Sequence, residues 1–532
     1  MKKKITAMFL ALMMIVSAVG CGQKQNGESG SESAKSTKKA AESTSEKKGD
    51  IDTSQEVQLK MILLGDKPAD FDVVYEKVNE LMKKKINATL EVEFYGWGDW
   101  NQKYPLAFAS GEDFDLIYTS SWAYYPQQVE KGGFLELTDE LLSTYAPESY
   151  TRVTKDQWEN TKINGKIYMI PYGRKVANNS QMVLIRGDLR EKYNIPEVKD
   201  LESYKNFLLE IAEKEDSVLA YNAGGSDGAM YVCSLFSSQQ YGIGGVGLFG
   251  IYATGISLDI PATTESGIPQ YLDVLEDERI MGAYKLMKEF REAGVWSQSA
   301  LSNQTFPLAA FENGTSASMP QGAGNTALTY EKLNALHPEW KLEIAEIDYA
   351  TDDIWINPST ADGMAVHANA KNPERALMAL DLLRYDKEIN DLTTLGIEGV
   401  HWEAVGDTQY RSLEKSVDFP PDGACPWGWR TELFRDSADC PQIVLDYQKR
   451  VQEEGKIAPA LLFNFDSEPV SAEFAACSAI AAEYAPILTS GFAEDVEGTW
   501  KEYRDKLNSV GFEKVLEEYK KQLEEFLTSY GK

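Results

Sequence analysis

Residues 57–64, Val57-Gln-Leu-Lys-Met-Ile-Leu-Leu64, form an apolar run that ends at Gly65 and predicts a buried β-strand. Residues 71–85 follow with apolar side chains at helical spacing. They close on three lysines, which suit the negative end of a helix dipole. Residues 90–94 then alternate apolar and acidic side chains as a second strand. This strand–helix–strand pattern predicts an α/β fold.

The pattern continues with a helical stretch over 100–110 and a short strand over 114–118. Strands that alternate with helices predict a parallel sheet covered on both faces, with ligands bound outside the carboxyl ends of the strands. The residues at these ends read Gly65-Asp66-Lys67, Tyr95-Gly96-Trp97 and Thr119-Ser120-Ser121-Trp122. Lys67, Trp97, Ser120 and Trp122 are therefore candidate ligand-binding residues, together with Tyr172, which ends a later apolar run.

The chain continues beyond Tyr172 for too long to share a single hydrophobic core. Strands are predicted over 182–185, 315–319 and 363–367, and the last 60 residues or so have a helical pattern. We expect two lobes. The first should hold residues 55–172 and a return near 311–358, and the second should hold 173–310 and 359–532, including the C-terminal helices.

The beginning of the chain has the pattern of an export signal. Three lysines, an apolar run from Ile5 to Val19 and small residues before Cys21 predict a signal peptide over 1–20. Cys21 stands where bacterial lipoproteins carry their lipidated cysteine, and acylation of its thiol would anchor the protein on the outer face of the cell membrane. A plain secretory signal is the alternative, because Ala18-Val19-Gly20 also resembles a cleavage site.

Residues 21–54 contain almost no apolar side chains, with Ile51 the first after Cys21 among Val, Leu, Ile and the aromatics. Such a segment cannot bury enough surface to offset the entropy of ordering it, so we expect a disordered tether. The body beyond it is acidic, since the chain has 83 Asp and Glu against 53 Lys and Arg. This charge argues against nucleic acid as a partner.

The sequence offers little support for metal or redox chemistry. The chain has three histidines, which stand far apart, so neither a metal site nor another cofactor is expected. Four cysteines follow Cys21, namely Cys233, Cys425, Cys440 and Cys477, and the sequence leaves open whether they pair or stay as free buried thiols.

Two motifs could be interpreted as catalytic or cofactor sites. Residues 242–247 satisfy GxGxxG, but no strand before it or helix after it is evident, so a loop is favoured over a dinucleotide site. Asp113, Asp115, Glu398 and Glu403 could form a glycosidase pair. Pairs of this kind arise by chance among 83 acidic residues, so we expect no enzyme and keep a secreted glycoside hydrolase as a minor alternative.

Tryptophans in loop-like stretches, several of them beside Gly or Pro, give the strongest binding signal. Flat aromatic faces can stack on the apolar side of a pyranose ring, although peptides also stack on aromatics and some of these rings will fill the core. The candidates of this kind are Trp97, Trp122, Trp355, Trp402, Trp427 and Trp429.

At this point the chain resembles a known family. The export signal, the tether and Gly111-Glu-Asp-Phe-Asp-Leu-Ile117 resemble family 1 extracellular solute-binding proteins of ABC importers. The segments 371–376 and 396–402, and the C-terminal pattern from Phe465 to Gln522, are similar to the subgroup that ends in a domain of unknown function.

The resemblance implies a two-lobed, periplasmic-binding-protein-like (type II) fold with a helical C-terminal extension. It also implies that a solute is held between the lobes, that no catalysis occurs, and that the partner is an ABC transporter permease. An oligosaccharide is the expected solute and a peptide is the alternative.

Overall fold

A computed structural model describes residues 51–177, 182–224, 228–241, 257–259, 270–272, 278–347, 354–457, 462–463 and 465–530 of the 532-residue chain. The chain divides into two units, Met1–Asp52 and Thr53–Lys532, and every helix and strand described lies in the second. The predicted signal peptide, Cys21 and nearly all of the tether lie outside the described residues, as does the GxGxxG segment.

The first lobe is built on a five-stranded sheet of order β2-β1-β3-β11-β4. Its strands are β1 (Val57–Leu64), β2 (Ala88–Tyr95), β3 (Leu116–Thr119), β11 (Gly363–Val366) and β4 (Ile170–Pro171). The first three are parallel, as the sequence predicted. Strand β11 runs antiparallel to both β3 and β4, so the sheet is mixed.

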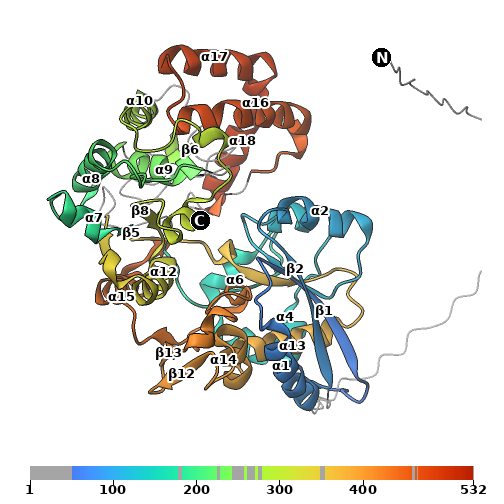
Figure 1. The fold of residues 1–532 in the computed structure, drawn as a ribbon. Helices are drawn as coiled ribbons and strands as arrows, with labels where there is room; N and C mark the ends of the chain where they lie inside the picture. Colours follow the sequence, from blue (N-terminus) through green and yellow to red (C-terminus); the bar gives the residue numbers. More distant parts are fainter. Residues whose placement is uncertain are drawn as a thin grey trace, which may run out of the picture. The chain divides into compact units, whose positions relative to one another are not determined.

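The helices of this lobe cover the sheet and follow its strands along the chain (Figure 1). They are α1 (Phe71–Ile86), α2 (Trp100–Ser110), α3 (Tyr125–Glu130), α4 (Asp139–Tyr145), α5 (Pro147–Arg152), α6 (Lys155–Thr161), α13 (Pro373–Tyr385) and α14 (Lys387–Leu395). Helix α1 buries Phe71, Val74 and Val78 and ends at Asn87, which has the left-handed conformation that closes a helix. The predicted elements over 57–118 are thus confirmed.

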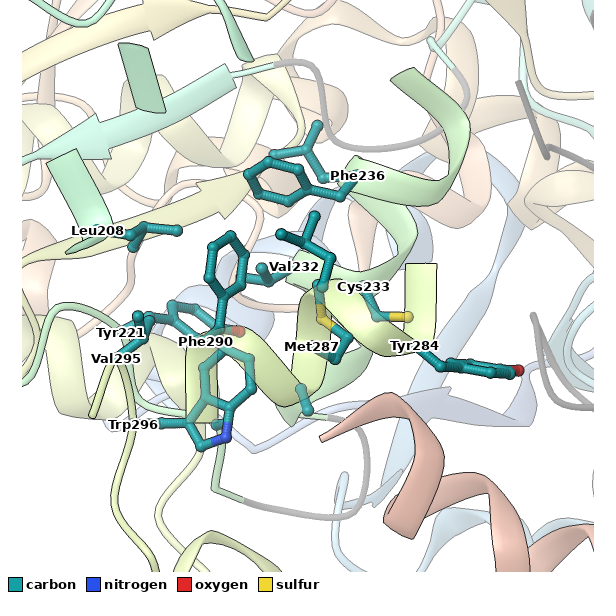
Figure 2. Close-up of a cluster of buried hydrophobic side chains, with 14 of the residues drawn as sticks. Leu208, Tyr221, Val232, Cys233, Phe236, Tyr284, Met287, Phe290, Val295 and Trp296 are labelled. Carbon is teal, nitrogen blue, oxygen red and sulfur yellow. The ribbon is translucent and has the colours of Figure 1, made fainter. Parts of the chain in front are cut away.

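The second lobe has a three-stranded antiparallel sheet of order β8-β5-β9. Its elements are β5 (Met182–Ile185), β8 (Ser318–Gln321), β9 (Glu343–Glu346), α7 (Gly187–Lys192), α8 (Leu201–Lys214), α9 (Gly228–Tyr241), α10 (Glu278–Glu292), α11 (Pro307–Glu312) and α12 (Ala323–Leu336), with a small hairpin of β6 (Ser257–Asp259) and β7 (Gln270–Leu272). Phe236 and Phe290 lie at the centre of its hydrophobic core, and Trp296 packs against Phe290 (Figure 2).

Residues 311–358 were expected in the first lobe and the segment that follows residue 359 in the second, and this prediction is wrong. Strand β8, from the segment 311–358, pairs with β5 of the second sheet, while β11, from the segment after 359, inserts between β3 and β4 of the first. Residues such as Leu380 and Trp429 accordingly lie in the core of the first lobe. Both strands have only four residues and are buried throughout, so their own sequence does not reveal which sheet completes its hydrogen bonding with them.

Smaller elements follow β9 and α14. They are β10 (Trp355–Ile356), β12 (Trp402–Val405), β13 (Gln409–Ser412), β14 (Asp436–Ser437), α15 (Gln442–Glu454) and β15 (Lys456–Ile457). Strand β10 pairs with β15, and β12, β13 and β14 form a separate three-stranded sheet.

Three helices close the chain, as the pattern of the last 60 residues or so predicted. They are α16 (Ser471–Thr489), α17 (Val496–Ser509) and α18 (Phe512–Tyr530). Helices α16 and α17 contact α10, and Trp296 Nε1 donates a hydrogen bond to the Ser490 carbonyl at 3.1 Å. The C-terminal helices therefore share the core of the second lobe.

Three properties of the described residues bear on membrane insertion, metal binding and disulfide formation. Among the described residues, no helix has the length and apolar character to cross a bilayer, and no group of three or more His, Cys, Asp or Glu could hold a metal ion. Cys233, Cys425, Cys440 and Cys477 are free thiols, which answers the question of pairing that the sequence left open.

We predict that Gly491→Ala disturbs the packing of the C-terminal helices against α10 and so destabilises the protein. Gly491 has a φ of 72°, and a Cβ there would lie 2.2 Å from the Met287 carbonyl oxygen. Gly294 has a φ of 83° with open space around it, so Gly294→Ala carries backbone strain alone, about 1–2 kcal/mol. Gly491→Ala should lower the free energy of unfolding, measured in urea, by roughly 1–3 kcal/mol more than Gly294→Ala does, because the Met287 backbone must move. Equal losses in the two variants would contradict the close packing.

Candidate functional site

Four tryptophans gather at the carboxyl ends of β2 and β3. Trp97 follows β2, Trp100 begins α2, Trp122 follows β3, and Trp427 lies in a 3₁₀ turn over Pro426–Trp429. These positions are where ligands sit in an α/β sheet. Trp97 and Trp122 were expected from this rule, and the structure places Trp427 beside them.

Trp427, Trp97 and Trp122 form a row of rings, which we call the tryptophan row. The ring of Trp97 is nearly parallel to that of Trp427, at 19° and 6.2 Å between centroids, and lies 6.4 Å from Trp122 at 30°. Trp97 and Trp122 are 48% and 47% exposed. Half-exposed neighbouring indoles leave much apolar surface in water, as binding surfaces often do.

Gly65 lies close to two rings of this row, and its backbone conformation requires glycine. It directly follows β1 with a φ of 113°, a conformation that other residues rarely adopt. A Cβ on it would lie 3.5 Å from Trp97 Nε1 and 3.8 Å from the Trp427 ring. The glycine predicted to end the first strand thus lies beneath two rings of the row.

Trp122 is fixed in direction by contacts from both sides. Its Nε1 donates to the Ala361 carbonyl at 2.8 Å. The edge of Trp100 meets its ring at 85° and 5.6 Å, and Trp100 in turn packs on Tyr124. The row therefore has a set geometry before any ligand arrives, which lowers the entropy cost of binding.

A polar layer lies next to the row. Tyr118, fully buried in β3, packs its ring 5.7 Å from Trp122 and 6.2 Å from Trp427. Its hydroxyl donates to Asp362 Oδ1 at 2.5 Å. Burial raises the pKa of Asp362 to about 6, whereas the Tyr118 hydrogen bond and the charge of Arg430 lower it. Arg430 also donates to Asp422 at 2.9 Å.

Three other candidates are held in local structure. Lys67 forms an ion pair with Asp72 at 2.7 Å on the surface. Ser120 is buried, and its Oγ accepts the Ala123 N–H at 2.9 Å to shape the turn after β3. Tyr172 is buried, with its hydroxyl donating to the Asn357 carbonyl at 3.2 Å.

The remaining tryptophan candidates are core residues. Trp355 is 6% exposed and packs in the core of the second lobe, whereas Trp429 is fully buried in the first and donates from Nε1 to Thr393 Oγ1 at 3.2 Å. Trp402 is 3% exposed. A tryptophan beside Gly or Pro therefore does not by itself mark an exposed ring.

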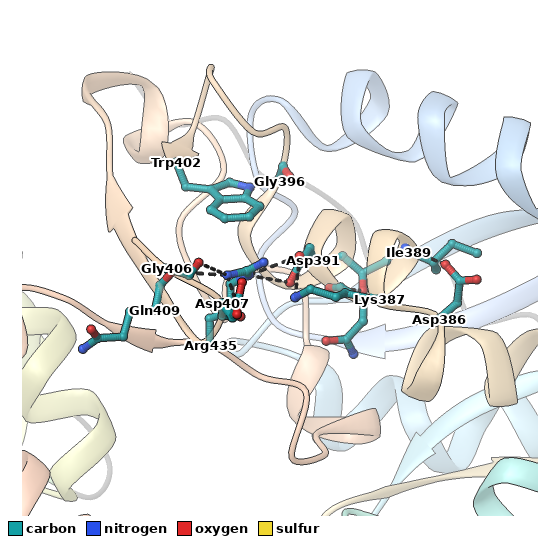
Figure 3. A network of polar contacts seen from close by, with 12 residues as sticks. Asp386, Lys387, Ile389, Asp391, Gly396, Trp402, Gly406, Asp407, Gln409 and Arg435 are labelled. Carbon is teal, nitrogen blue, oxygen red and sulfur yellow. Dashed lines mark hydrogen bonds and ion pairs between the residues drawn. The ribbon is translucent and has the colours of Figure 1, made fainter. Parts of the chain in front are cut away.

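Trp402 belongs to a separate network (Figure 3). Its Nε1 donates to the Gly396 carbonyl at 3.0 Å, and the Arg435 guanidinium lies 5.0 Å from its ring centroid. Arg435 is paired with Asp391 at 3.1 Å, and the two side chains are 7% and 14% exposed. Trp402 thus packs against a largely buried ion pair, a structural role that needs no ligand.

Comparison with known proteins agrees with this architecture. The model of the family "Bacterial extracellular solute-binding protein" matches residues 76–385, more than half of the chain. A second model, "Domain of unknown function (DUF3502)", matches residues 459–528, which contain α16 and α17. The resemblance proposed from the sequence is confirmed in both parts.

Individual relatives cover nearly the whole chain. A "Carbohydrate ABC transporter substrate-binding protein" of Streptococcus pneumoniae is 26% identical over 495 residues, 91% of this chain and 94% of that protein. The crystal structure of the N-glycan transport solute binding protein from Streptococcus pneumoniae aligns with a TM-score of 0.70 at 24% identity, covering 89% and 99% of the two chains. The alginate-binding protein AlgQ2 aligns with a TM-score of 0.60 at 16% identity, covering 90% and 99%.

The two-lobed fold with its C-terminal helices therefore matches solved solute-binding proteins. By the extent of the family match, this chain belongs to the bacterial extracellular solute-binding proteins and ends in a helical domain of unknown function.

Proposed function

We propose that this protein is the carbohydrate-binding component of an ABC importer and that the tryptophan row is its sugar-contacting surface. The row carries the proposal, because Trp97 and Trp122 present half-exposed faces at the carboxyl ends of the strands. Flat aromatic faces suit the apolar side of a pyranose, and neighbouring rings suit more than one sugar unit.

The names of related proteins support a carbohydrate over a peptide. The relative at 26% identity is named as a carbohydrate-binding component of an ABC transporter, and the similar structures include complexes with Man5GlcNAc and kestose. A peptide remains the second candidate, since peptides also stack on aromatic rings.

The contacts of the acidic residues do not favour the hydrolase alternative. Asp113 is paired with Lys371 on the surface. Asp115 is buried and accepts the Lys60 N–H at 3.0 Å, and Glu403 lies 3.5 Å from Arg411. These carboxylates are engaged in separate structural contacts, whereas a glycosidase needs two that face one scissile bond.

Capture proceeds by closure of the two lobes around the sugar. Each lobe has its own hydrophobic core, and the chain passes between them after β4, before β11 and again before the C-terminal helices. Closure about such connections is the usual motion of two-lobed binding proteins. The sugar shifts the open–closed equilibrium by binding the closed form better, and the transporter permease receives the closed form.

The protein is anchored through a diacylglyceryl group on Cys21, and residues 21–54 tether the body to the outer face of the membrane. The sequence around Cys21 motivates this step, as does the export implied by an extracellular family. A tether raises the effective concentration of the receptor at its permease.

Thermal-shift measurements should separate the two classes of solute. The panel is a high-mannose glycan fragment, kestose, xylo-oligosaccharides, alginate oligosaccharides and a mixture of tri- to hexapeptides. At least one sugar should raise the melting temperature, because a ligand that binds only the folded form stabilises it by mass action. A shift with peptides and with no sugar would show that the carbohydrate assignment is wrong.

Tryptophan substitutions should locate the sugar. Trp97→Ala should weaken binding of the best sugar by about tenfold or more in calorimetry, since it removes the middle ring of the row. Trp402→Ala is the matched control. It should lower stability by roughly 3–5 kcal/mol through a core cavity and leave affinity near that of the parent. The site is misplaced if Trp402→Ala loses affinity and Trp97→Ala does not.

Mass spectrometry of the mature protein from its native membrane tests the anchor. We expect an N-terminal Cys21 carrying a diacylglyceryl group, and Cys21→Ser should release the protein into the medium. A mature chain with an unmodified Cys21 thiol would rule out the anchor.

A further inference from the structure

The segment just before β11 holds the loop that carries Trp122. The Thr360 carbonyl accepts the Ser121 N–H at 2.7 Å, and the Ala361 carbonyl accepts Trp122 Nε1 at 2.8 Å. Next in the chain, the carboxylate of Asp362 accepts the Tyr118 hydroxyl. These three consecutive residues, which we call the 360–362 turn, thus accept hydrogen bonds from the Ser121 backbone, the Trp122 indole and the Tyr118 hydroxyl.

Asp362 is also tied to the point where the chain leaves the first lobe. Its backbone carbonyl accepts the Tyr172 N–H at 3.0 Å, and Tyr172 directly follows β4. The Tyr172 hydroxyl donates in turn to the Asn357 carbonyl. The 360–362 turn therefore lies at the end of one connection between the lobes and is hydrogen-bonded to the start of another.

Tyr118 connects Asp362 to the rings of the tryptophan row. It is fully buried, and its ring contacts both Trp122 and Trp427. Its hydroxyl is held at 2.5 Å by a carboxylate, and hydrogen bonds to ionised groups are roughly twice as strong as neutral ones. Asp362 therefore controls two of the three rings without itself needing to touch a ligand.

We propose that Asp362 is a positioning residue: its ionised carboxylate fixes Tyr118 and the 360–362 turn so that the tryptophan row is ready for carbohydrate, and its protonation loosens the row and weakens binding. This inference rests on the proposed function for its ligand. It adds a dependence of affinity on external pH.

The groups around Asp362 come from three further parts of the first lobe. They are Tyr118 of β3, Tyr172 after β4, and Asp422, Cys425 and Arg430 of the segments on either side of the 3₁₀ turn. Burial raises the pKa of Tyr118, of Tyr172 and of Cys425, so all three stay neutral in mild acid.

Arg430 is the cation that faces this carboxylate. Burial opposes its charge, but Asp422 and Asp362 raise its pKa, so it stays charged. Burial raises the pKa of Asp362 from 3.8 to about 6. As the pH falls through about 6, Asp362 takes up a proton, the Tyr118 hydrogen bond loses its charge assistance, and Arg430 keeps Asp422 alone as a charged partner.

Calorimetry with the tightest-binding sugar of the panel tests the effect on affinity. The parent should lose about three- to tenfold in affinity between about pH 7.5 and pH 5. Asp362→Asn should bind more weakly than the parent at about pH 7.5 and show little further change in acid, because it cannot ionise.

Asp381→Asn is the matched control. Asp381 is also a carboxyl of the first lobe whose pKa is raised by burial, but it accepts the Ser149 and Glu148 N–H groups at 2.7 and 3.1 Å on α5. This variant should keep the pH profile of the parent. The proposal would be overturned if the affinity of Asp362→Asn depended on pH as that of the parent does. It would also be overturned if Asp381→Asn lost the pH dependence in the same way.

A double-mutant cycle tests the route through Tyr118. Tyr118→Phe keeps the ring and removes the hydroxyl, so it should weaken binding about as much as Asp362→Asn, and the double variant should be no weaker than either. Fully additive losses would show that Asp362 acts by another route.

A measurement without ligand separates this inference from the proposed function. In ¹⁵N-tryptophan-labelled protein, the Trp122 indole resonance, assigned with Trp122→Phe, should titrate near pH 6 in the parent and not in Asp362→Asn. Absence of sugar binding to the parent would contradict the proposed function, whereas a flat Trp122 titration in the parent would contradict the role of Asp362.

Discussion

The antiparallel insertion of β11 between β3 and β4 is the constraint on which the rest of the structure depends. It completes the sheet of the first lobe with a strand that arrives only after the chain has built most of the second. Because a buried strand must satisfy its hydrogen bonds on both edges, β11 draws the residues that precede it to the carboxyl end of β3. Those residues, 360–362, then hold Ser121, Trp122 and Tyr118.

The same insertion relates architecture to binding. A protein that closes on a solute needs connections between its lobes that bend, yet its binding surface has to stay ordered. Here the crossing segment before β11 and the support of the tryptophan row are adjacent in the chain. The row is fixed through Tyr118 and Asp362, and the buried carboxylate that does this carries a cost in desolvation that its hydrogen bond and Arg430 offset only in part. Binding to a surface that is already ordered costs less entropy than binding to one that must be ordered by the ligand.

The features that were predicted from the sequence are those that local residue patterns determine. The strand–helix–strand unit over 57–95 followed from apolar periodicity, and Trp97 and Trp122 followed from their place after strands. The partners of β8 and β11 could not be predicted, since both are four-residue strands whose pairing is decided by distant chain. The burial of Trp402 and Trp429 could not be predicted, because loop context alone does not distinguish an exposed ring from a buried one. Asp362 and the supporting role of Tyr118 were missed, because their hydrogen bond joins residues far apart in the sequence.

Carbohydrate binding on the tryptophan row can be tested with a crystal structure of the protein in complex with the best-binding oligosaccharide. We expect a sugar ring stacked on the face of Trp97, with Trp122 and Trp427 contacting the same or neighbouring units, and with Trp402 and Trp429 still buried. A sugar bound elsewhere in the molecule, with the faces of Trp97 and Trp122 left in solvent, would contradict it.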